Sequence, residues 1–381
     1  MGKIEQIIKI TEKLEKEKLH KFKNTCLREY SAFSNCSKCV DVCPANSLEV
    51  SVRKLIINPE TCLECGACTS ICPVHALQLK DFSPTDIADD ILMSSAKGEV
   101  KICCDYLYYL KDLENRRLAL LPCFAVLDEN LIMHLFASGI KKIELYEGNC
   151  SKCPARSSGT VTNLVMESMN KLCPVSCKLE LIKYSAGLDY EHAFVELGDT
   201  TSKSELSSQG QAKREFFKGL RQKGKKGAIF AGQNVLNLNL ESLEEPKISD
   251  LSHNINHLRN SRILAIKEQL EPDIVNSDKQ ASNRLFCDLS IDFETCNGCN
   301  LCYSVCPTSA LHLVEVEHDD CGYQVLGFLA QNCINCKLCQ DACKSGCVSL
   351  LPEITFKNLY SKQEKLLKIS TYLNAEKRKN G

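Results

Sequence analysis

Cysteines recur in this chain at a spacing that suits metal ligation. Three runs place cysteines at i, i+3, i+6 and i+10: Cys62, Cys65, Cys68 and Cys72; Cys296, Cys299, Cys302 and Cys306; Cys333, Cys336, Cys339 and Cys343. A fourth run, FSNCSKCVDVCP over residues 33–44, keeps Cys36, Cys39 and Cys43 but has Phe33 in the leading position. Clustered thiolates hold either iron–sulfur clusters or zinc, and the spacing separates the two.

Three cysteines at i, i+3 and i+6 in one tight loop can wrap three corners of a cubane. The fourth cysteine begins a helical turn and leans toward a second cluster, so two runs together complete two sites. Structural zinc usually takes two C-x2-C pairs separated by a longer loop. Because the third and fourth cysteines follow at once here, the runs predict [4Fe–4S] clusters.

The runs resemble two-cluster bacterial ferredoxins over residues 24–85 and 286–355. The two stretches also resemble each other, down to the lead-ins IINPETC and SIDFETC, which indicates an internal duplication. This resemblance implies two α+β ferredoxin-like dicluster domains that bind four [4Fe–4S] clusters.

The crossing of the fourth cysteine predicts four ligand sets. We name them site I (Cys36, Cys39 and Cys72 with Cys26), site II (Cys62, Cys65 and Cys68 with Cys43), site III (Cys333, Cys336 and Cys339 with Cys306) and site IV (Cys296, Cys299 and Cys302 with Cys343).

Site I needs a ligand in place of Phe33, and Cys26 is the one unassigned cysteine nearby. It lies ten residues before Cys36, and a loop of that length closes at small entropic cost. The alternative is a three-iron cluster with Cys26 as a buried spare thiol. Cys347 falls where the other runs have small residues, so we expect it to pack against a cluster. Cys287 and Cys321 receive no role.

The middle of the chain alternates short apolar strands (EVKICC, LALLPC, KKIELYEGNC and KLELIKYS) with helical stretches. This alternation predicts an α/β domain with a parallel sheet. Either Cys103 or Cys104, then Cys123 and Cys150, fall at the carboxyl ends of strands, where open parallel sheets bind ligands. Cys153 follows Cys150 at C-x2-C spacing, so four sulfurs could converge from separate loops.

Residues 99–190 also resemble the delta subunit of methyl-viologen-reducing hydrogenase, found with heterodisulfide reductases. The shared features are the Cys-Cys pair ending the first strand, the Pro-Cys ending the second, the helix LIMHLFASG and the G-N-C-x-x-C after the third. The resemblance implies a [2Fe–2S] cluster on these loop cysteines. Zinc, a different cluster, or a metal-free docking domain are the alternatives.

Composition fits this organisation. The 381 residues include 26 cysteines and carry a formal charge of −1. A chain of this length with no apolar run long enough to span a membrane, and opening on a charged stretch, is expected to be soluble in a reducing compartment, the cytoplasm. Six segments are expected: an amphipathic helix over 1–23, a two-cluster domain over 24–92, the α/β domain over 93–195, a polar connector over 196–285, a second two-cluster domain over 286–355, and a basic tail helix over 356–381.

No G-x-G-x-x-G follows a predicted strand and no Walker loop is present, so no nucleotide site is expected. The pattern therefore predicts an electron-transfer iron–sulfur protein, with hydrogenase, reductase or flavoprotein subunits as partners and with no nucleic-acid partner. The alternatives are a thiol–disulfide reductase that uses the central cysteines, and a redox-sensing or assembly factor with structural clusters.

Overall fold

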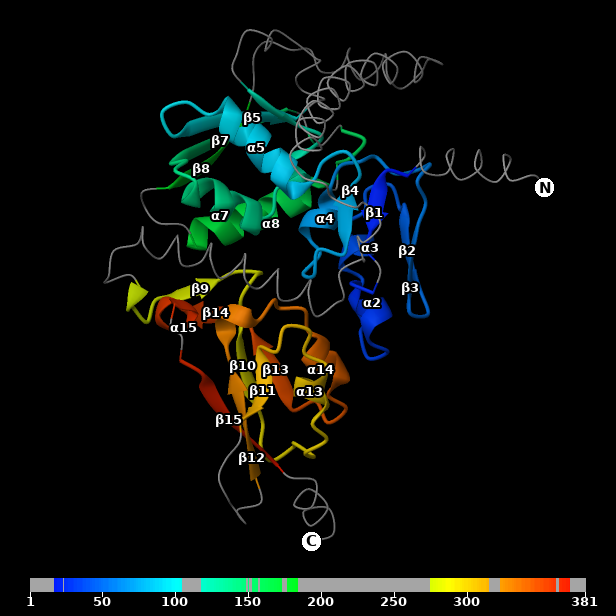
Figure 1. Cartoon of the computed structure of the whole chain (residues 1–381), viewed down its shortest axis with the longest axis vertical. Coiled ribbons are helices and arrows are strands. Elements are labelled where there is room, and N and C mark those ends of the chain that lie inside the picture. Colours follow the sequence, from blue (N-terminus) through cyan, green and yellow to red (C-terminus); the bar gives the residue numbers. More distant parts are fainter. Residues whose placement is uncertain are drawn as a thin grey trace, which may run out of the picture.

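The computed structural model describes residues 17–22, 24–104, 118–148, 150, 153–156, 158–172, 177–183, 275–314, 323–360 and 363–370. They form an N-terminal unit (residues 17–82), a central unit (residues 83–183) and a C-terminal unit (residues 275–370). In Figure 1 these are blue, cyan to green, and yellow to red. Within these ranges no helix combines the length and apolar character needed to cross a membrane.

The N-terminal unit is built from short elements that frame two cysteine loops. In chain order these are β1 (Leu19–Lys21), α2 (Leu27–Tyr30), α3 (Lys38–Asp41), β2 (Leu48–Ser51), β3 (Lys54–Ile57), α4 (Ala67–Ser70) and β4 (Leu77–Leu79). The outer strands β1 and β4 pair antiparallel, and β2 and β3 form an antiparallel hairpin between them in sequence. Helices α3 and α4 each carry the third cysteine of a run, and Cys26 caps α2, so these four-residue helices position ligands rather than build a core.

The C-terminal unit repeats this arrangement, as the duplication predicts. Its elements are β9 (Gln280–Ser282), β10 (Asp288–Ile291), α13 (Leu301–Ser304), β11 (Leu311–Val314), β12 (Tyr323–Phe328), η4 (Ala330–Asn332), α14 (Leu338–Ala342), β13 (Val348–Leu351), β14 (Glu353–Thr355), α15 (Phe356–Tyr360) and β15 (Lys365–Ser370). Strands β10 and β13 form the outer antiparallel pair, and β11 and β12 form the inner hairpin. Two additions, the β9–β14 pair and β15 on the edge of β12, distinguish it from the first unit.

The central unit contains the predicted parallel sheet. Its elements are α5 (Pro84–Ser94), β5 (Glu99–Cys104), β6 (Ala119–Leu121), η1 (Phe124–Val126), α7 (Glu129–Ala137), β7 (Lys142–Glu147), α8 (Ser158–Leu172) and β8 (Lys178–Lys183). Four strands lie in the order β6-β5-β7-β8, all parallel. The α/β prediction is therefore confirmed.

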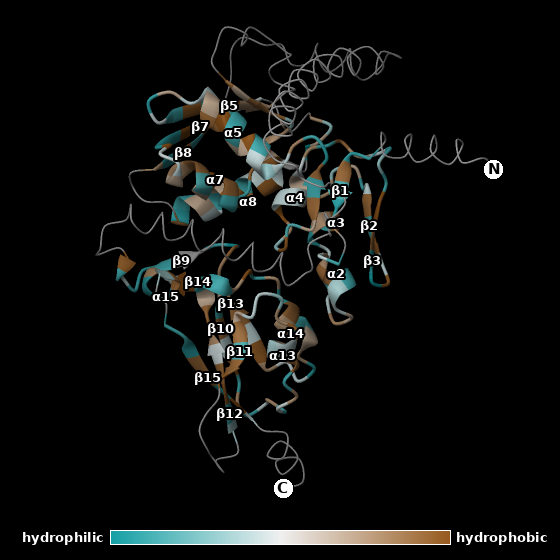
Figure 2. Ribbon diagram, viewed as in Figure 1, coloured by the Kyte–Doolittle hydropathy of each residue, from teal (hydrophilic) through white to brown (hydrophobic). Residues whose placement is uncertain are grey.

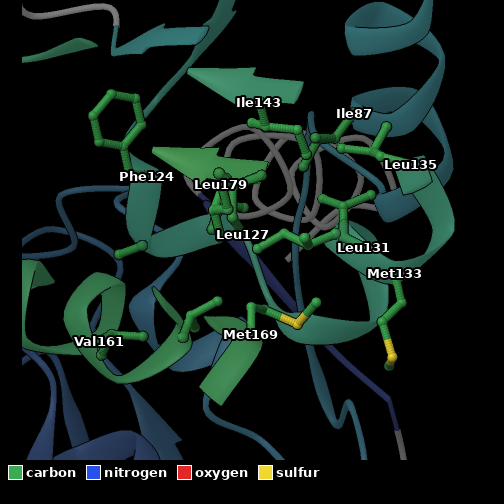
Figure 3. Close-up of a cluster of buried hydrophobic side chains, with 14 of the residues drawn as sticks. Ile87, Phe124, Leu127, Leu131, Met133, Leu135, Ile143, Val161, Met169 and Leu179 are labelled. Carbon is green, nitrogen blue, oxygen red and sulfur yellow. The ribbon is translucent and has the colours of Figure 1, made fainter. Parts of the chain in front are cut away.

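One face of this sheet carries the core. Ile102 lies opposite Leu145 in register, and Ile143 opposite Leu179, so alternate strand residues point to the same side. They pack with Ile87 of α5 and Met169 of α8 in a buried cluster, part of which is shown in Figure 3. In Figure 2, hydrophobic and hydrophilic residues alternate along α5 and α7, as expected for helices with one face on a core.

Packing places two segments in other units or elements than the sequence predicted. Helix α5 belongs to the central unit because Ile87 and Ile91 are buried against its sheet, which moves the boundary from 92 to about 83. The expected helix over 1–23 does not include residues 19–21, which form strand β1 with Leu19 buried. The rest of that stretch up to residue 16 lies outside the described residues.

The connector and tail also differ. Residues 280–282 of the predicted connector pair with β14, and residues 365–370 of the predicted tail helix form β15 on β12. Ile369 and Ser370 of β15 are buried. Residues 365–370 therefore pair with strand β12 despite their basic composition, because burial and strand pairing outweigh local preference. Residues 196–274 and 371–381 lie outside the described residues.

A buried ion pair joins all three units. Glu129 of α7 has no exposed surface, and a carboxylate in such a place needs a charged partner. Arg284 supplies it from the C-terminal unit, with its Nη2 donating to Glu129 Oε2 at 2.8 Å and its Nε to Oε1. The same Nη2 donates to the carbonyl of Ser70 in the N-terminal unit at 3.2 Å.

We expect Gly66→Ala to destabilise the protein more than a matched glycine substitution. Gly66 has φ +76°, and a Cβ there would lie 2.7 Å from Val126 Cβ, so the change adds overpacking of about 1–3 kcal/mol to a backbone cost of about 1–2 kcal/mol. Gly139→Ala, at φ +95° with nothing within 4 Å, carries the backbone cost alone. Thermal unfolding of both iron-loaded variants tests this; equal losses in melting temperature would contradict the close contact.

Candidate iron–sulfur sites

The four predicted ligands of site II line one small cavity. Cys62, Cys65 and Cys68 come from the loop that enters α4, and Cys43 reaches in from the end of the other run. The loop turns through left-handed backbone at Glu64 and Gly66. The backbone N–H of Ser47 donates to Cys43 Sγ at 3.2 Å. Hydrogen bonds to sulfur are among the features that set the reduction potential of a bound cluster.

Site I has the same construction, with Cys26 among its members. Cys26, Cys36, Cys39 and Cys72 all line a second cavity. Cys26 is the residue that caps α2, and Arg28 of that helix donates to the carbonyls of Ser34 (2.8 Å) and Cys36 (2.9 Å). The guanidinium thus holds the 34–36 loop beside Cys26. The N–H of Ala76 donates to Cys72 Sγ at 3.3 Å, matching Ser47 in site II.

Phe33, which replaces the first cysteine of the motif, packs at the boundary between the N- and C-terminal units. It contacts an apolar cluster that contains Leu27 and Val74 from one unit and Ile334 and Leu338 from the other. The side chain therefore helps to close the interface beside site I and to exclude water from it.

The C-terminal cysteines form two groups of close neighbours. Burial raises the pKa of Cys302 to about 12, and the nearby charges of Cys296, Cys299 and Cys343 add to it. Burial likewise raises the pKa of Cys336 to about 12, with Cys333 and Cys306 adding to it. These neighbours are the members of sites IV and III respectively. Cys299 of site IV is the exposed one among the described cysteines.

Two cysteines outside the ligand sets lie beside these sites. Cys347 is buried with its sulfur 3.4 Å from Cys343 Sγ in site IV, where the sequence predicted a residue packing against a cluster. Cys287, which the sequence left without a role, is fully buried with its sulfur 3.4 Å from Cys333 Sγ in site III. Its place two residues after the predicted connector gave no signal of that contact.

The buried thiols also show what a cluster must supply. Burial raises the pKa of Cys39 to about 12, and Cys72, Cys36 and Cys26 add to the shift. Burial raises the pKa of Cys65 to about 12 and that of Cys72 to about 11. Without metal these groups are neutral thiols at pH 7, so ligation by cationic iron must displace their protons.

Strand alternation separates the two candidate cysteines that end β5. Cys103 has no exposed surface and lies with Tyr146 on the sheet face opposite the main core. Cys104, one residue on, packs against the main core and also touches the edge of the Cys103–Tyr146 cluster. The neighbouring residue types gave no indication of this choice.

The other central cysteines lie near Cys104. Burial raises the pKa of Cys150, and the charges of Glu147, Cys104 and Cys123 add to it. Burial also raises the pKa of Cys153, with Cys123 adding to it. Cys123 begins η1, where the N–H of Ala125 donates to its sulfur at 3.5 Å. The carboxyl ends of β5, β6 and β7 thus gather Cys104, Cys123 and Cys150 with Cys153.

The cysteine groups follow one another in space. Burial raises the pKa of Cys65, and the nearby charge of Cys123 adds to the shift. The central group therefore adjoins site II. Burial also raises the pKa of Cys68 of site II, and the nearby charge of Cys39 of site I adds to that shift. Lys38 lines the cavity of site I and donates to the carbonyl of Asn335, between two ligands of site III, at 3.3 Å. Burial raises the pKa of Cys339 of site III, and the nearby charge of Cys302 of site IV is among the causes that add to the shift.

In the described part of the chain, no three His, Cys, Asp or Glu side chains converge closely enough to hold a single metal ion. For comparison, four cysteines that bind one zinc ion have their sulfurs about 3.8 Å apart, because the Zn–S bond is about 2.3 Å and the geometry is tetrahedral.

Comparison with known proteins places a family at both outer units. A family model described as a 4Fe-4S dicluster domain matches residues 34–76 and residues 295–347. No curated protein matches the chain. The chain therefore contains two 4Fe-4S dicluster domains, which bind iron–sulfur clusters and fit an electron-transfer role in general terms. Cys26 lies upstream of the first match, and the central unit lies outside both, so its resemblance to the hydrogenase delta subunit and its [2Fe–2S] cluster gain no support.

We expect Cys26→Ser to convert one of four cubanes to a three-iron form or to lose it, because site I would retain three thiolates. Phe33→Cys in that background should restore the cubane. Cys347→Ser, which removes a buried cysteine outside the four predicted ligand sets, is the matched control. Iron analysis and the paramagnetic spectrum of the oxidised protein test this. A Cys26→Ser protein with unchanged iron and spectrum would show that site I is completed in another way.

Proposed function

We propose that the chain is an electron-transfer iron–sulfur protein whose four [4Fe–4S] sites lie in single file between two partner-facing ends. The observation that carries this proposal is the spatial order of the cysteine groups. Sites II and I adjoin through Cys68 and Cys39, which pack in one cluster, and sites III and IV through Cys339 and Cys302, which pack in another. Lys38 links site I to site III across the unit boundary.

The donor sets suit cubanes. Sites I and II each enclose a cavity lined by four thiols, with a backbone N–H already directed at one sulfur. We assign the ligands as in the four sets above, with Cys26 in site I. A cubane at each site would take up and release one electron. The protein excludes water, because the apolar cluster around Leu27 and Leu338 seals the boundary between sites I and III.

The proposal extends to the cysteines of the central unit. We assign Cys104, Cys123, Cys150 and Cys153 to a fifth centre, the [2Fe–2S] site that the resemblance to the hydrogenase delta subunit implies. Support comes from their gathering at the carboxyl edge of a parallel sheet. Cys103 is excluded from the set because it lies on the opposite face. This group adjoins site II, so it stands at the far end of the file from site IV.

Exposure indicates where partners dock. Cys299 brings site IV to the surface at one end, and the central unit forms the other. Hydrogenase, reductase or flavoprotein subunits of the cytoplasm are the proposed partners. A thiol–disulfide reductase is the second candidate, because Cys150 lies beside the carboxylate of Glu147, which could exchange a proton with it.

Iron content and electron uptake test the relay together. The four cubanes predict about 16 irons per chain, or about 18 with a filled central site, and about four electrons taken from reduced methyl viologen. Iron near eight, abundant zinc, or fewer than two electrons per chain would contradict the relay. Alkylation with iodoacetamide separates the second candidate: a central cysteine modified rapidly in the reduced, iron-loaded protein would favour the reductase.

A further inference from the structure

The boundary between sites I and III carries positive charge where two anionic clusters would approach. Loop 33–41 of the N-terminal unit packs on loop 334–341 of the C-terminal unit. The N–H of Asn35 donates to Asp341 Oδ2 at 2.9 Å, and Lys38 Nζ donates to the carbonyl of Asn335 at 3.3 Å. Four-thiolate cubanes are anionic, so an apolar boundary alone would leave their repulsion unscreened.

Lys38 is a cation that reaches from site I to site III. It follows Cys36 by two residues and lines the site I cavity, and its ammonium group reaches the carbonyl of the residue before Cys336. The ammonium group is therefore half-buried between the ligand loops of the two sites.

Other cations nearby are placed differently. Arg284 is held by the buried carboxylate of Glu129, so most of its charge is neutralised. Lys337 is exposed to solvent and is screened there. Among the described residues no carboxylate lies within ion-pair distance of Lys38, and its hydrogen bond is to a neutral carbonyl.

We propose that Lys38 is a shared counter-charge that raises the reduction potentials of sites I and III and thereby sets the electron-transfer step between the two dicluster domains. The physical reason is that reduction adds one negative charge to a site, and a nearby cation stabilises the reduced form more than the oxidised form. Because one ammonium group serves both sites, their potentials move together. This inference rests on the proposed four-cluster function.

The test is a redox titration of the full, iron-loaded chain, followed by electron paramagnetic resonance. Lys38→Met keeps the length of the apolar stem and removes the charge. We expect two of the four electron equivalents to become harder to reduce, by up to about tenfold in the reduction equilibrium, which is about 59 mV for one electron. Lys38→Arg should keep the wild-type values. Lys171→Met, an exposed lysine of α8, should leave all four unchanged.

A loosened boundary could also change potentials, and Asp341→Ala distinguishes this. That variant removes the other polar contact of the boundary together with a negative charge, so a charge effect predicts a shift of opposite sign or none. The proposal is overturned if Lys38→Met shifts no equivalents or only one, if Lys38→Arg behaves like Lys38→Met, or if Asp341→Ala lowers the potentials in the same way. Each variant must retain about 16 irons; a wild-type chain with about eight would instead refute the proposed function.

Discussion

The crossing of the fourth cysteine is the interaction on which the rest of the structure depends. In the proposed assignment, sites II, III and IV each take three thiolates from one loop and the fourth from the end of another run, and site I takes Cys72 from the other run, so neither run can complete a site by itself. The same crossing brings Cys39 of site I and Cys68 of site II close together. Ligation and proximity thus have one cause, and the short strands and four-residue helices serve mainly to hold the loops in that relation.

The second level of organisation is the junction of the three units. Glu129 in α7, Arg284 before β10 and the carbonyl of Ser70 in α4 meet in one buried network. A buried carboxylate without its partner would be strongly destabilising, so the pair fixes the units in one arrangement. The apolar cluster around Leu27 and Leu338 and the contact of Gly66 with Val126 complete the junction. The order of the cysteine groups is a product of this junction.

The sequence predicted those features that depend on local spacing. The cysteine runs, the duplication and the parallel sheet all have short-range signatures, and Cys26 could be proposed because one site lacked a ligand. Choosing between Cys103 and Cys104 required strand register, because one residue changes the face of the sheet. The contact of Cys287 with Cys333 and the place of Lys38 beside Asn335 join residues 46 and 297 positions apart, which no local pattern reports. Strand β15 has a basic sequence, yet it pairs with the edge of β12, whose backbone groups are available for hydrogen bonding.

The central claim is that the sites form one file across the boundary of the two dicluster domains. The most direct measurement is the electron paramagnetic resonance spectrum of the fully reduced, iron-loaded chain, compared with that of a Cys36→Ser, Cys39→Ser variant in which site I is lost. Neighbouring reduced clusters broaden each other's signals by magnetic coupling. The account predicts coupled signals in the wild type and, in the variant, a site II signal that has lost its coupling to site I, with sites III and IV still coupled to each other. Magnetically independent signals in the wild type, or a variant in which the site II signal is unchanged, would contradict it.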